Sequence, residues 1–314
     1  MIREHQWCYS LEKSLSYLVE DNVRGINLGG FITLHSYGGG TGKTSLAIAL
    51  AEIFSMKGKR VCLIDLDCSA PSTCFAFELE KADFWINDYL NGVCGIENVL
   101  VDVTDKCGYD GQLFICPANF RTEAIRDITS KDRKWEMKAL GRLLSLKTTL
   151  LTEMGLDYVI FDTSSGIQYS SINAIVSSDI VILVDTTDKL QVKGTQIMVD
   201  ELYELFEKKT GILLNKVLVG RKSLAQMEAL STLEYENLYN FPVLGVIPCS
   251  CEIPEVGIVT FFRKRPAHFF TRTLEKIALR VDSFASGAPV ERNDSKLKRI
   301  YRERLMKKVT GLRM

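Results

Sequence analysis

The chain has 314 residues, and its 39 Lys and Arg balance 39 Asp and Glu, so its net charge is zero. Apolar residues make up 46% of it, enough for the core of one large α/β domain or of two smaller ones. No apolar run approaches the ~18 residues that a membrane-spanning helix needs, and the first residues lack the apolar run of a secretory signal. We therefore expect a cytoplasmic globular protein rather than a secreted or membrane-spanning one.

The zero net charge conceals an asymmetry between the body of the chain and its end. Residues 296–314 contain eight Lys or Arg and one Glu, a charge of +7, so the rest of the chain totals −7. An acidic body is unfavourable for nucleic-acid binding over a broad surface. Any attraction to nucleic acid or to a membrane is therefore expected in the tail or in a local patch.

Strand-like apolar runs alternate with helical stretches from residue 31 onward. Several runs are apolar on successive residues, as in strands that are covered on both faces. This repetition predicts the α/β class, with a doubly wound, mostly parallel sheet, helices on both faces and a ligand at the carboxyl ends of the strands. The expected strands are residues 31–34, 60–65, 112–116, 158–161, 180–184, 213–219 and 243–247.

Four segments are expected along the chain. Residues 1–29 form an N-terminal extension with a short helix, whose default role is to cap the sheet edge. The globular domain follows over residues 30–285, and residues 286–295 have the composition of a flexible linker. The remaining residues, 296–314, form a basic helix.

The nine cysteines are scattered in or beside apolar strands, which favours reduced, core-filling thiols over a disulfide framework. Cys249 and Cys251 form the only close pair. Their spacing fits structural zinc poorly, and no second pair or neighbouring histidine completes a set.

The segment between the first strand and the following helix is the most specific feature of the chain. It is rich in glycine and ends in Gly-Lys-Thr. Glycines allow the backbone to wrap closely around an anion, and the helix start directs free N–H groups at it. Lys43 can reach the β- and γ-phosphates, and the Thr44 hydroxyl can ligate Mg²⁺. A glycine-rich linker would need neither this ending nor the flanking elements. The predicted nucleotide-binding residues of the loop are Gly38, Gly39, Gly40, Thr41, Gly42, Lys43, Thr44 and Ser45.

The loop resembles the deviant Walker A motif, Lys-Gly-Gly-x-Gly-Lys-Thr, of the MinD/ParA family of ATPases, because Tyr37 stands where an ordinary P-loop has glycine. The resemblance extends from about residue 31 to residue 278. Gly38 occupies the place of the signature lysine, which in the family reaches across a dimer interface to the partner's phosphates and supports hydrolysis. The resemblance therefore implies an ATPase with slow turnover. Two explanations of Gly38 are open: the natural protein lacks the lysine, or the sequence has been altered to weaken turnover.

A strand over residues 61–65 ends in two aspartates, Asp65 and Asp67, and resembles switch I of the family. The resemblance implies that Asp67 acts with Lys43 in catalysis, either by orienting the attacking water or by supporting Mg²⁺ through a water, with Asp65 less direct. A carboxylate at this strand end faces the phosphates, where it can accept a hydrogen bond from such a water. The alternative is that Asp67 caps a following helix that begins at residues 69–71.

A second apolar strand is closed by Asp162, which is a Walker B pattern. The following Asp-Thr-x-x-Gly resembles switch II of the same family. It implies that Asp162 holds the Mg²⁺ shell together with Thr44 and Asp67, and that the backbone around Gly166 senses the γ-phosphate.

Two late strands extend the resemblance. Residues 213–217 resemble the strand whose asparagine, here Asn215, reads the purine edge, since an amide both donates and accepts hydrogen bonds. If that strand runs on to residue 221, the base contact shifts to Arg221. Residues 241–248 resemble the strand ending in Ile-Pro, so Pro248 and the loop after it are expected to border the base.

The basic tail has apolar residues at positions 297, 300, 301, 305, 309 and 312, which are helical spacings. Such a stripe between basic flanks suits an anionic membrane, and it resembles the C-terminal helix of MinD-like members. The protein would then lie peripherally at the inner face of the cell membrane. A solvated or domain-packed helix and a nucleic-acid contact are the alternatives.

The leading functional hypothesis is a positional switch that uses ATP and Mg²⁺, forms an ATP-dependent homodimer, and binds a surface or a protein activator. A nucleotide-gated scaffold with little hydrolysis is the second hypothesis. A ParA-like partition ATPase on DNA is less favoured, because the body is acidic. A reductase resembling the nitrogenase iron protein would require cysteines that bridge a dimer, for which Cys94 and Cys116 are the candidates.

Overall fold

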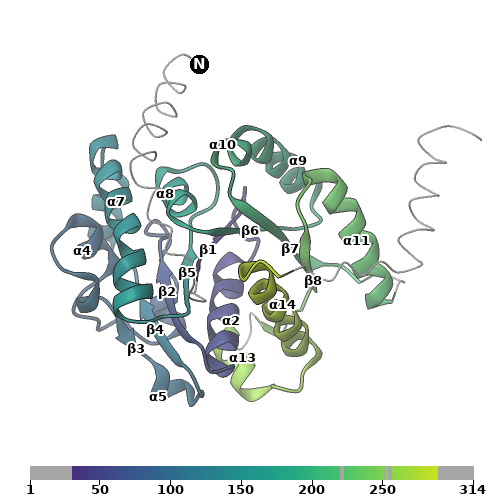
Figure 1. Cartoon of the computed structure of the whole chain (residues 1–314), viewed down its shortest axis with the longest axis horizontal. Coiled ribbons are helices and arrows are strands. Elements are labelled where there is room, and N and C mark those ends of the chain that lie inside the picture. The colour runs from purple at the N-terminus through teal and green to yellow at the C-terminus, as the bar shows by residue number, and fades with distance from the viewer. Residues whose placement is uncertain (1–29, 220–222, 251, 254–256, 289–314) are drawn as a thin grey trace, which may run out of the picture.

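The computed structural model describes residues 30–219, 223–250, 252–253 and 257–288 (Figure 1). An eight-stranded sheet in the order β3-β4-β2-β5-β1-β6-β7-β8 forms the centre, and every pairing is parallel except that of β3 with β4. The predicted α/β fold class is therefore confirmed. The strands are β1 (Gly30–His35), β2 (Arg60–Asp65), β3 (Val101–Asp102), β4 (Gln112–Cys116), β5 (Tyr158–Asp162), β6 (Ile180–Asp185), β7 (Lys209–Val217) and β8 (Val243–Pro248).

Helices cover both faces of the sheet (Figure 1). One face carries α2 (Lys43–Met56), α13 (Ile258–Lys264) and α14 (Phe269–Ala285). The other face carries α4 (Ile86–Asn91), α7 (Arg133–Leu146), α8 (Tyr169–Ser177) and α11 (Leu224–Tyr239). The remaining α-helices are α3 (Thr73–Ala76), α5 (Thr104–Cys107), α6 (Thr122–Thr129), α9 (Lys189–Met198) and α10 (Glu204–Phe206), with a 3₁₀ turn η1 (Ile96–Asn98) and π-helical segments η2 (Lys147–Glu153) and η3 (Val199–Tyr203).

Successive side chains of the central strands pack on opposite faces of the sheet, in two different hydrophobic clusters. Ile32 belongs to the cluster on the α2 side, whereas its neighbour Phe31 belongs to the cluster on the α7 side. Val61 and Cys62 of β2 divide in the same way. Since side chains alternate along a strand, a strand that is covered on both faces must be apolar at every position. This explains the continuous apolar runs of the sequence.

Three strands end level with one another at one edge of the sheet. Asp162, the last residue of β5, pairs with Leu34 of β1 on one side and with Asp65, the last residue of β2, on the other. The segments that follow β1, β2 and β5 therefore leave the sheet side by side. Ligands of open α/β sheets bind at this edge.

The expected strands agree with the structure except at β3 and β7. β3 was not predicted, because two residues of an antiparallel edge strand carry no pattern. β7 begins at Lys209, four residues earlier than expected, and ends at Val217 rather than at residue 219. Gly211 lies in this early part, where a Cβ would come within 2.5 Å of Leu244 Cδ1.

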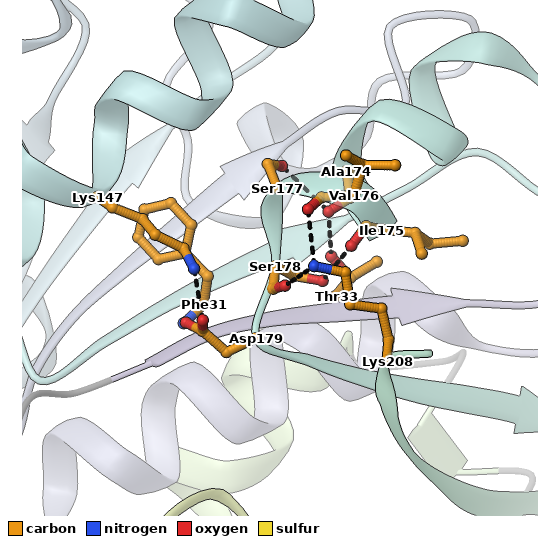
Figure 2. A network of polar contacts seen from close by, with 10 residues as sticks. All are labelled: Phe31, Thr33, Lys147, Ala174, Ile175, Val176, Ser177, Ser178, Asp179 and Lys208. Atoms are coloured by element: carbon orange, nitrogen blue, oxygen red, sulfur yellow. Dashed lines mark hydrogen bonds and ion pairs between the residues drawn. The ribbon is translucent and has the colours of Figure 1, made fainter. Parts of the chain in front are cut away.

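A polar network attaches the end of α8 to the sheet (Figure 2). Lys208 Nζ donates hydrogen bonds to the carbonyls of Val176 and Ser178, each at 2.9 Å. Asp179 Oδ2 accepts the N–H of Phe31 at the start of β1, also at 2.9 Å. The Lys208 contacts satisfy carbonyls at the helix end that have no partner within the helix. They fix α8, whose other end is joined to the segment after Asp162.

Some expectations fall on residues that the structure does not describe. The helix predicted within residues 1–29 and the basic helix over 296–314 lie outside the described residues, as does most of the expected linker. Among the helices that are described, none combines the length and the apolar character needed to cross a membrane.

Candidate functional site

The loop between β1 and α2 is shaped by glycine. Gly40 and Gly42 have φ of 72° and 93°, a left-handed conformation that a Cβ would strain. Gly42 is the N-cap of α2, so no side chain caps this helix, and its first turn contains no acidic residue. The first N–H groups of a helix have no partner within it. Those of α2 are therefore directed at an anion-binding position.

Lys43 lies folded against the loop, with only 7% of its surface exposed. Its Nζ donates to Ser36 Oγ at 2.8 Å, and Ser36 Oγ in turn donates to the carbonyl of Gly38 at 2.8 Å. Burial lowers the pKa of Lys43, while the charges of Asp162 and Asp67 raise it. The structure thus places Lys43 beside both predicted acidic residues. Thr44 and Ser45 follow it in the first turn of α2.

Asp162 is a fully buried carboxyl group. By distance and angle neither of its oxygens has a hydrogen-bond partner among the described residues, although the Thr44 hydroxyl and the Lys43 charge lie near enough to act on its pKa. Burial raises its pKa well above the usual range and nearby Asp65 adds to this, while the Thr44 hydroxyl and the Lys43 charge act in the opposite direction. An unsatisfied buried acceptor costs about 1–3 kcal/mol, and more when it is charged. A cation at this place would remove that cost.

The donors around Asp162 fit Mg²⁺ better than a metal that needs a full set of protein ligands. Within the described part of the chain, no three His, Cys, Asp or Glu residues come together as a metal site. Mg²⁺ is usually held by one or two carboxylates, waters and substrate phosphates rather than by an all-protein cage. Asp162 and the Thr44 hydroxyl beside it are groups of this kind.

The two aspartates after β2 have different surroundings. Asp65 is buried, and its Oδ2 accepts the Thr73 hydroxyl at 2.7 Å and the Thr73 N–H at 3.2 Å, so it holds the start of α3. Burial raises the pKa of Asp65 to about 6. Asp67 is partly exposed, and its Oδ1 accepts the Ser69 hydroxyl at 2.7 Å and the Ala70 N–H at 3.2 Å. The sequence left open a helix cap at this place, but α3 begins only at Thr73 with Ser72 as its N-cap, so these contacts form a turn. A role of Asp67 in catalysis or in metal binding stays a prediction.

The segment after β5 is attached directly to the loop. The N–H of Gly166 donates to the Ser36 carbonyl at 2.9 Å. His35 Nε2 contacts the Gly166 carbonyl at 2.9 Å, and His35 Nδ1 contacts the Tyr203 hydroxyl at 2.7 Å. Burial lowers the pKa of His35 to about 4, so the ring is neutral at pH 7. Because a carbonyl can only accept, Nε2 carries the proton and Nδ1 accepts from Tyr203. Sensing of a γ-phosphate by Gly166 stays a prediction.

Asn215 lies against the loop, although it is 174 residues from it in sequence. Its Nδ2 donates to the Thr41 carbonyl at 2.7 Å, and its Oδ1 accepts the Lys216 N–H at 2.9 Å. Lys216, which the sequence did not single out, has φ of 56° and donates through Nζ to the Gly40 carbonyl at 2.6 Å. A lysine beside Asn215 belongs to no motif. Base recognition by Asn215 stays a prediction, and its amide supports the loop in this structure.

The other predicted base contacts are only partly described. Arg221 lies outside the described residues, and β7 ends at Val217, before that position. Pro248 is the last residue of β8 and pairs with Val217, two residues beyond Asn215. Pro248 and Asn215 therefore lie near the same end of neighbouring strands.

Two further polar atoms at the loop are buried without a partner among the described residues: Thr41 Oγ1 and Gln191 Oε1. Gln191, from α9, was not predicted, because it contacts the loop only through the tertiary fold. Gly39 is less crowded, since a Cβ there would have its nearest neighbour, Ser165 Oγ, at 3.8 Å.

The cysteine candidates do not form a site. Cys116 is completely buried in the sheet, with its thiol 3.8 Å from that of Cys62, and burial raises its pKa. A thiol in this position is not available to bridge two subunits, so Cys94 and Cys116 do not support the iron-protein hypothesis. Cys249 is an exposed free thiol, and Cys251 lies outside the described residues.

A cavity of about 890 Å³ lies beside the segments that follow β2 and β5. Leu66 and Ile167 line it from these segments, and Trp135 and Glu136 line it from α7. Asn173 Nδ2 donates to the Glu136 carboxylate at 3.0 Å, and burial raises the pKa of Glu136 to about 7. The cavity is a place where a bound group would touch both segments at once.

Comparison with known proteins gives the family. Residues 32–258, more than half of the chain, match the family described as the CobQ/CobB/MinD/ParA nucleotide binding domain. The chain belongs to this family. The resemblance to MinD/ParA proteins and the prediction of a nucleotide site in a P-loop fold are thereby confirmed.

Individual relatives support the same assignment. The septum site-determining protein MinD of Bacillus subtilis is 25% identical over 232 residues, which are 72% of this chain and 78% of that protein. The cell division ATPase MinD of Pyrococcus furiosus superposes with a TM-score of 0.64 at 19% identity, over 82% of this chain and 100% of that chain. MinD of Pyrococcus horikoshii, solved with Mg-ADP, gives a TM-score of 0.63 at 21% identity, over 81% and 96%. The structural likeness agrees with the doubly wound fold.

Proposed function

We propose that the protein is a MinD/ParA-like ATPase that acts as an ATP-dependent dimeric switch in spatial organisation, such as cell division, partitioning or positioning. The observation that carries the proposal is the buried Asp162, whose two oxygens have no partner among the described residues, beside the uncapped start of α2. A nucleotide on the loop with Mg²⁺ would provide both the anion and the cation that this arrangement lacks.

ATP or ADP with Mg²⁺ is the proposed ligand, and each residue of the site has a role. The loop from Gly38 to Thr44 binds the phosphates through its N–H groups, and Lys43 adds a positive charge. Thr44 and Asp162 hold the metal, which neutralises charge that develops on the phosphates. Asp67, with one oxygen used in its own turn, orients the attacking water. The Mg-ADP named for the Pyrococcus horikoshii protein agrees with this choice.

Apolar side chains around the site support a face-to-face homodimer. Tyr37 in the loop is 43% exposed, Ile167 and Tyr169 after β5 are 50% and 46% exposed, and Leu190 at the start of α9 is 83% exposed. Large apolar groups that gather on one surface mark interaction sites. All four belong to segments at the carboxyl edge of the sheet, so a second copy placed there would cover both the apolar groups and the nucleotide.

Gly38 makes slow hydrolysis part of the proposal. It lacks the side chain that in the family reaches the partner's phosphates, so turnover depends on Asp67, Lys43 and the metal within one chain. A scaffold that binds ATP without hydrolysing it is the second candidate, and the same glycine favours it. Phosphate release by the full chain and by Lys43→Ala separates the two candidates. Faster release by the unaltered chain supports the ATPase, and equal release supports the scaffold.

The basic residues 296–314 are the proposed attachment to an anionic membrane, at the inner face of a cell membrane. The cavity beside Ile167 and Trp135 suits a protein activator, since an occupant would contact both segments that border the site. Partition on DNA is less favoured, because residues 1–295 carry a charge of −7.

The partner to which the protein attaches, membrane or DNA, is tested with vesicles that contain anionic lipid and with plain duplex DNA, in the presence of Mg-ATP. The full chain is compared with a chain that ends at residue 295. The membrane proposal predicts ATP-dependent sedimentation of the full chain alone. Equal sedimentation of both chains would contradict the role of the tail, and tight DNA binding by both would favour partition.

A further inference from the structure

Helix α9 lies directly on the first half of the phosphate loop. A Cβ built on Gly38 would come within 2.2 Å of Gln191 Nε2 and 2.3 Å of Gln191 Oε1. The Gln191 amide therefore occupies the space into which any side chain at position 38 would project. Gly38 accommodates a contact from within the same chain.

The same helix makes a second contact of this kind three residues further along. A Cβ built on Gly194 would lie 2.0 Å from Tyr37 Cε1 and 2.3 Å from Tyr37 Cδ1, so the Tyr37 ring rests on Gly194. Positions i and i+3 share one face of a helix. Two adjacent loop residues thus contact two positions on one face of α9: Gly38 contacts Gln191, and Tyr37 contacts Gly194. In each contact one of the two partners is a glycine.

The backbone of Gln191 is fixed at the start of α9. The N-cap Asp188 accepts the N–H groups of Leu190 and Gln191 at 3.0 and 3.1 Å. The side chain of Gln191, by contrast, is incompletely paired, since its Oε1 is buried and has no hydrogen-bond partner among the described residues. Thr41 and Asp162 carry unpaired buried oxygens as well. These unpaired atoms belong to the loop itself, to the end of β5 and to α9.

We infer that Gln191 is a further nucleotide-site residue, whose amide lies on Gly38 and pairs with the phosphate end of the bound nucleotide or with the water around it. An amide can donate through Nε2 to a phosphate oxygen and accept through Oε1 from a water. A buried polar group that has no partner within the described residues would be satisfied by a ligand that pairs with it. The inference rests on the proposed function and adds to it a contact made within one chain.

Two independent substitutions remove the same amide from the loop. Gln191→Met keeps the length of the side chain but removes its hydrogen-bonding groups. Gly38→Ala adds a Cβ that displaces the amide, which is the end of a flexible side chain and moves without a shift of the backbone. Each is expected to weaken Mg-ATP binding by roughly tenfold, the loss typical of one hydrogen bond to a charged group. Because both act on one group, the double variant should bind no more weakly than about tenfold either.

The test is calorimetric titration of the full chain and its variants with Mg-ATP, together with melting curves in nucleotide-free buffer. Gln196→Met, on the same helix, and Gly141→Ala, where a Cβ would meet nothing within 4 Å, are the matched controls and should bind as the unaltered chain does. Melting temperatures of Gln191→Met and Gly38→Ala without nucleotide should stay close to that of the unaltered chain. A purely structural role would lower these temperatures and leave affinity unchanged.

Three results would overturn the inference: unchanged affinity in Gln191→Met, a loss that is explained by unfolding, or losses that multiply in the double variant. If the unaltered chain itself fails to bind Mg-ATP, the proposed function fails. If it binds and Gln191→Met binds equally well, only the role of Gln191 is wrong.

Discussion

Replacement of Asp162 by asparagine should have opposite effects on the free and the ligand-bound protein. Asp162 is buried at the end of β5, and neither of its oxygens has a hydrogen-bond partner among the described residues. Asparagine keeps the shape and removes the charge. The amide of asparagine is still a buried polar group without a partner, so only the extra cost of the charge is removed. At a pH at which Asp162 is ionised, the free energy of unfolding of the nucleotide-free chain should therefore rise by about 1 kcal/mol or more.

The same substitution should reduce the stabilisation that Mg-ATP provides. A ligand present at about 100 times its Kd raises the free energy of unfolding by about 2.7 kcal/mol. If the loss of the metal contact weakens binding tenfold, the same concentration is about 10 times Kd, and the gain falls to about 1.4 kcal/mol. Denaturant unfolding with and without Mg-ATP measures both quantities in one series.

Asp157→Asn is the matched control at the other end of β5. Asp157 accepts the Arg60 N–H at 2.8 Å and pairs with Lys59 at 3.8 Å, so its carboxylate already has partners. The control should lose a little stability without nucleotide and keep the full gain from Mg-ATP. An Asp162→Asn variant that is less stable without nucleotide and still gains about 2.7 kcal/mol would refute the assignment of Asp162 to the metal.

Two further substitutions test what stabilises the fold. Burial raises the pKa of Glu52 from 4.5 to about 7, so the folded state binds more protons in this range and stability falls as pH rises. In denaturant titrations, the free energy of unfolding of Glu52→Gln should exceed that of the unaltered chain by a difference that grows up to ~3 kcal/mol between pH 4.5 and 7. A difference that does not change with pH would contradict this. Lys208→Met leaves the Val176 and Ser178 carbonyls without their donor and should cost about 1–3 kcal/mol. An unchanged unfolding midpoint would show that the network in Figure 2 contributes nothing.

The central strands could be predicted because their physical requirement is local. A strand that is buried on both faces must be apolar at successive positions, and β2 and β4 match the expected ranges at both ends. β7 differs because its beginning, Lys209-Thr210-Gly211, is not apolar. It joins the sheet by pairing with β6 and through the close approach of Gly211 to Leu244, neither of which a local pattern records.

The same distinction holds at the site. The loop could be predicted because it consists of consecutive residues between a strand and a helix. Asp162 could be predicted because it ends an apolar strand. Lys216 and Gln191 could not, since each reaches the loop across more than 150 residues of chain. For Asp67 the sequence left a catalytic role and a helix cap open, and the structure shows a turn over residues 67–70 before α3 begins at Thr73.

Restoring a lysine at position 38, which the family resemblance suggests as a test of turnover, is not a simple addition in this fold. The new side chain must first displace the Gln191 amide. Phosphate release by Gly38→Lys therefore reports on both changes. Comparison of Gly38→Lys with the double variant Gly38→Lys, Gln191→Ser separates them.

The central claim is that the loop beside Lys43 binds the phosphates of a nucleotide whose metal is held near Asp162. Isothermal titration of the full chain with ATP, in buffer with Mg²⁺ and in buffer with a chelator, tests it most directly. The account predicts saturable heat with one site per chain, weaker binding without Mg²⁺, and no measurable binding by Lys43→Ala. The absence of heat from the unaltered, folded chain in the presence of Mg²⁺ would contradict it.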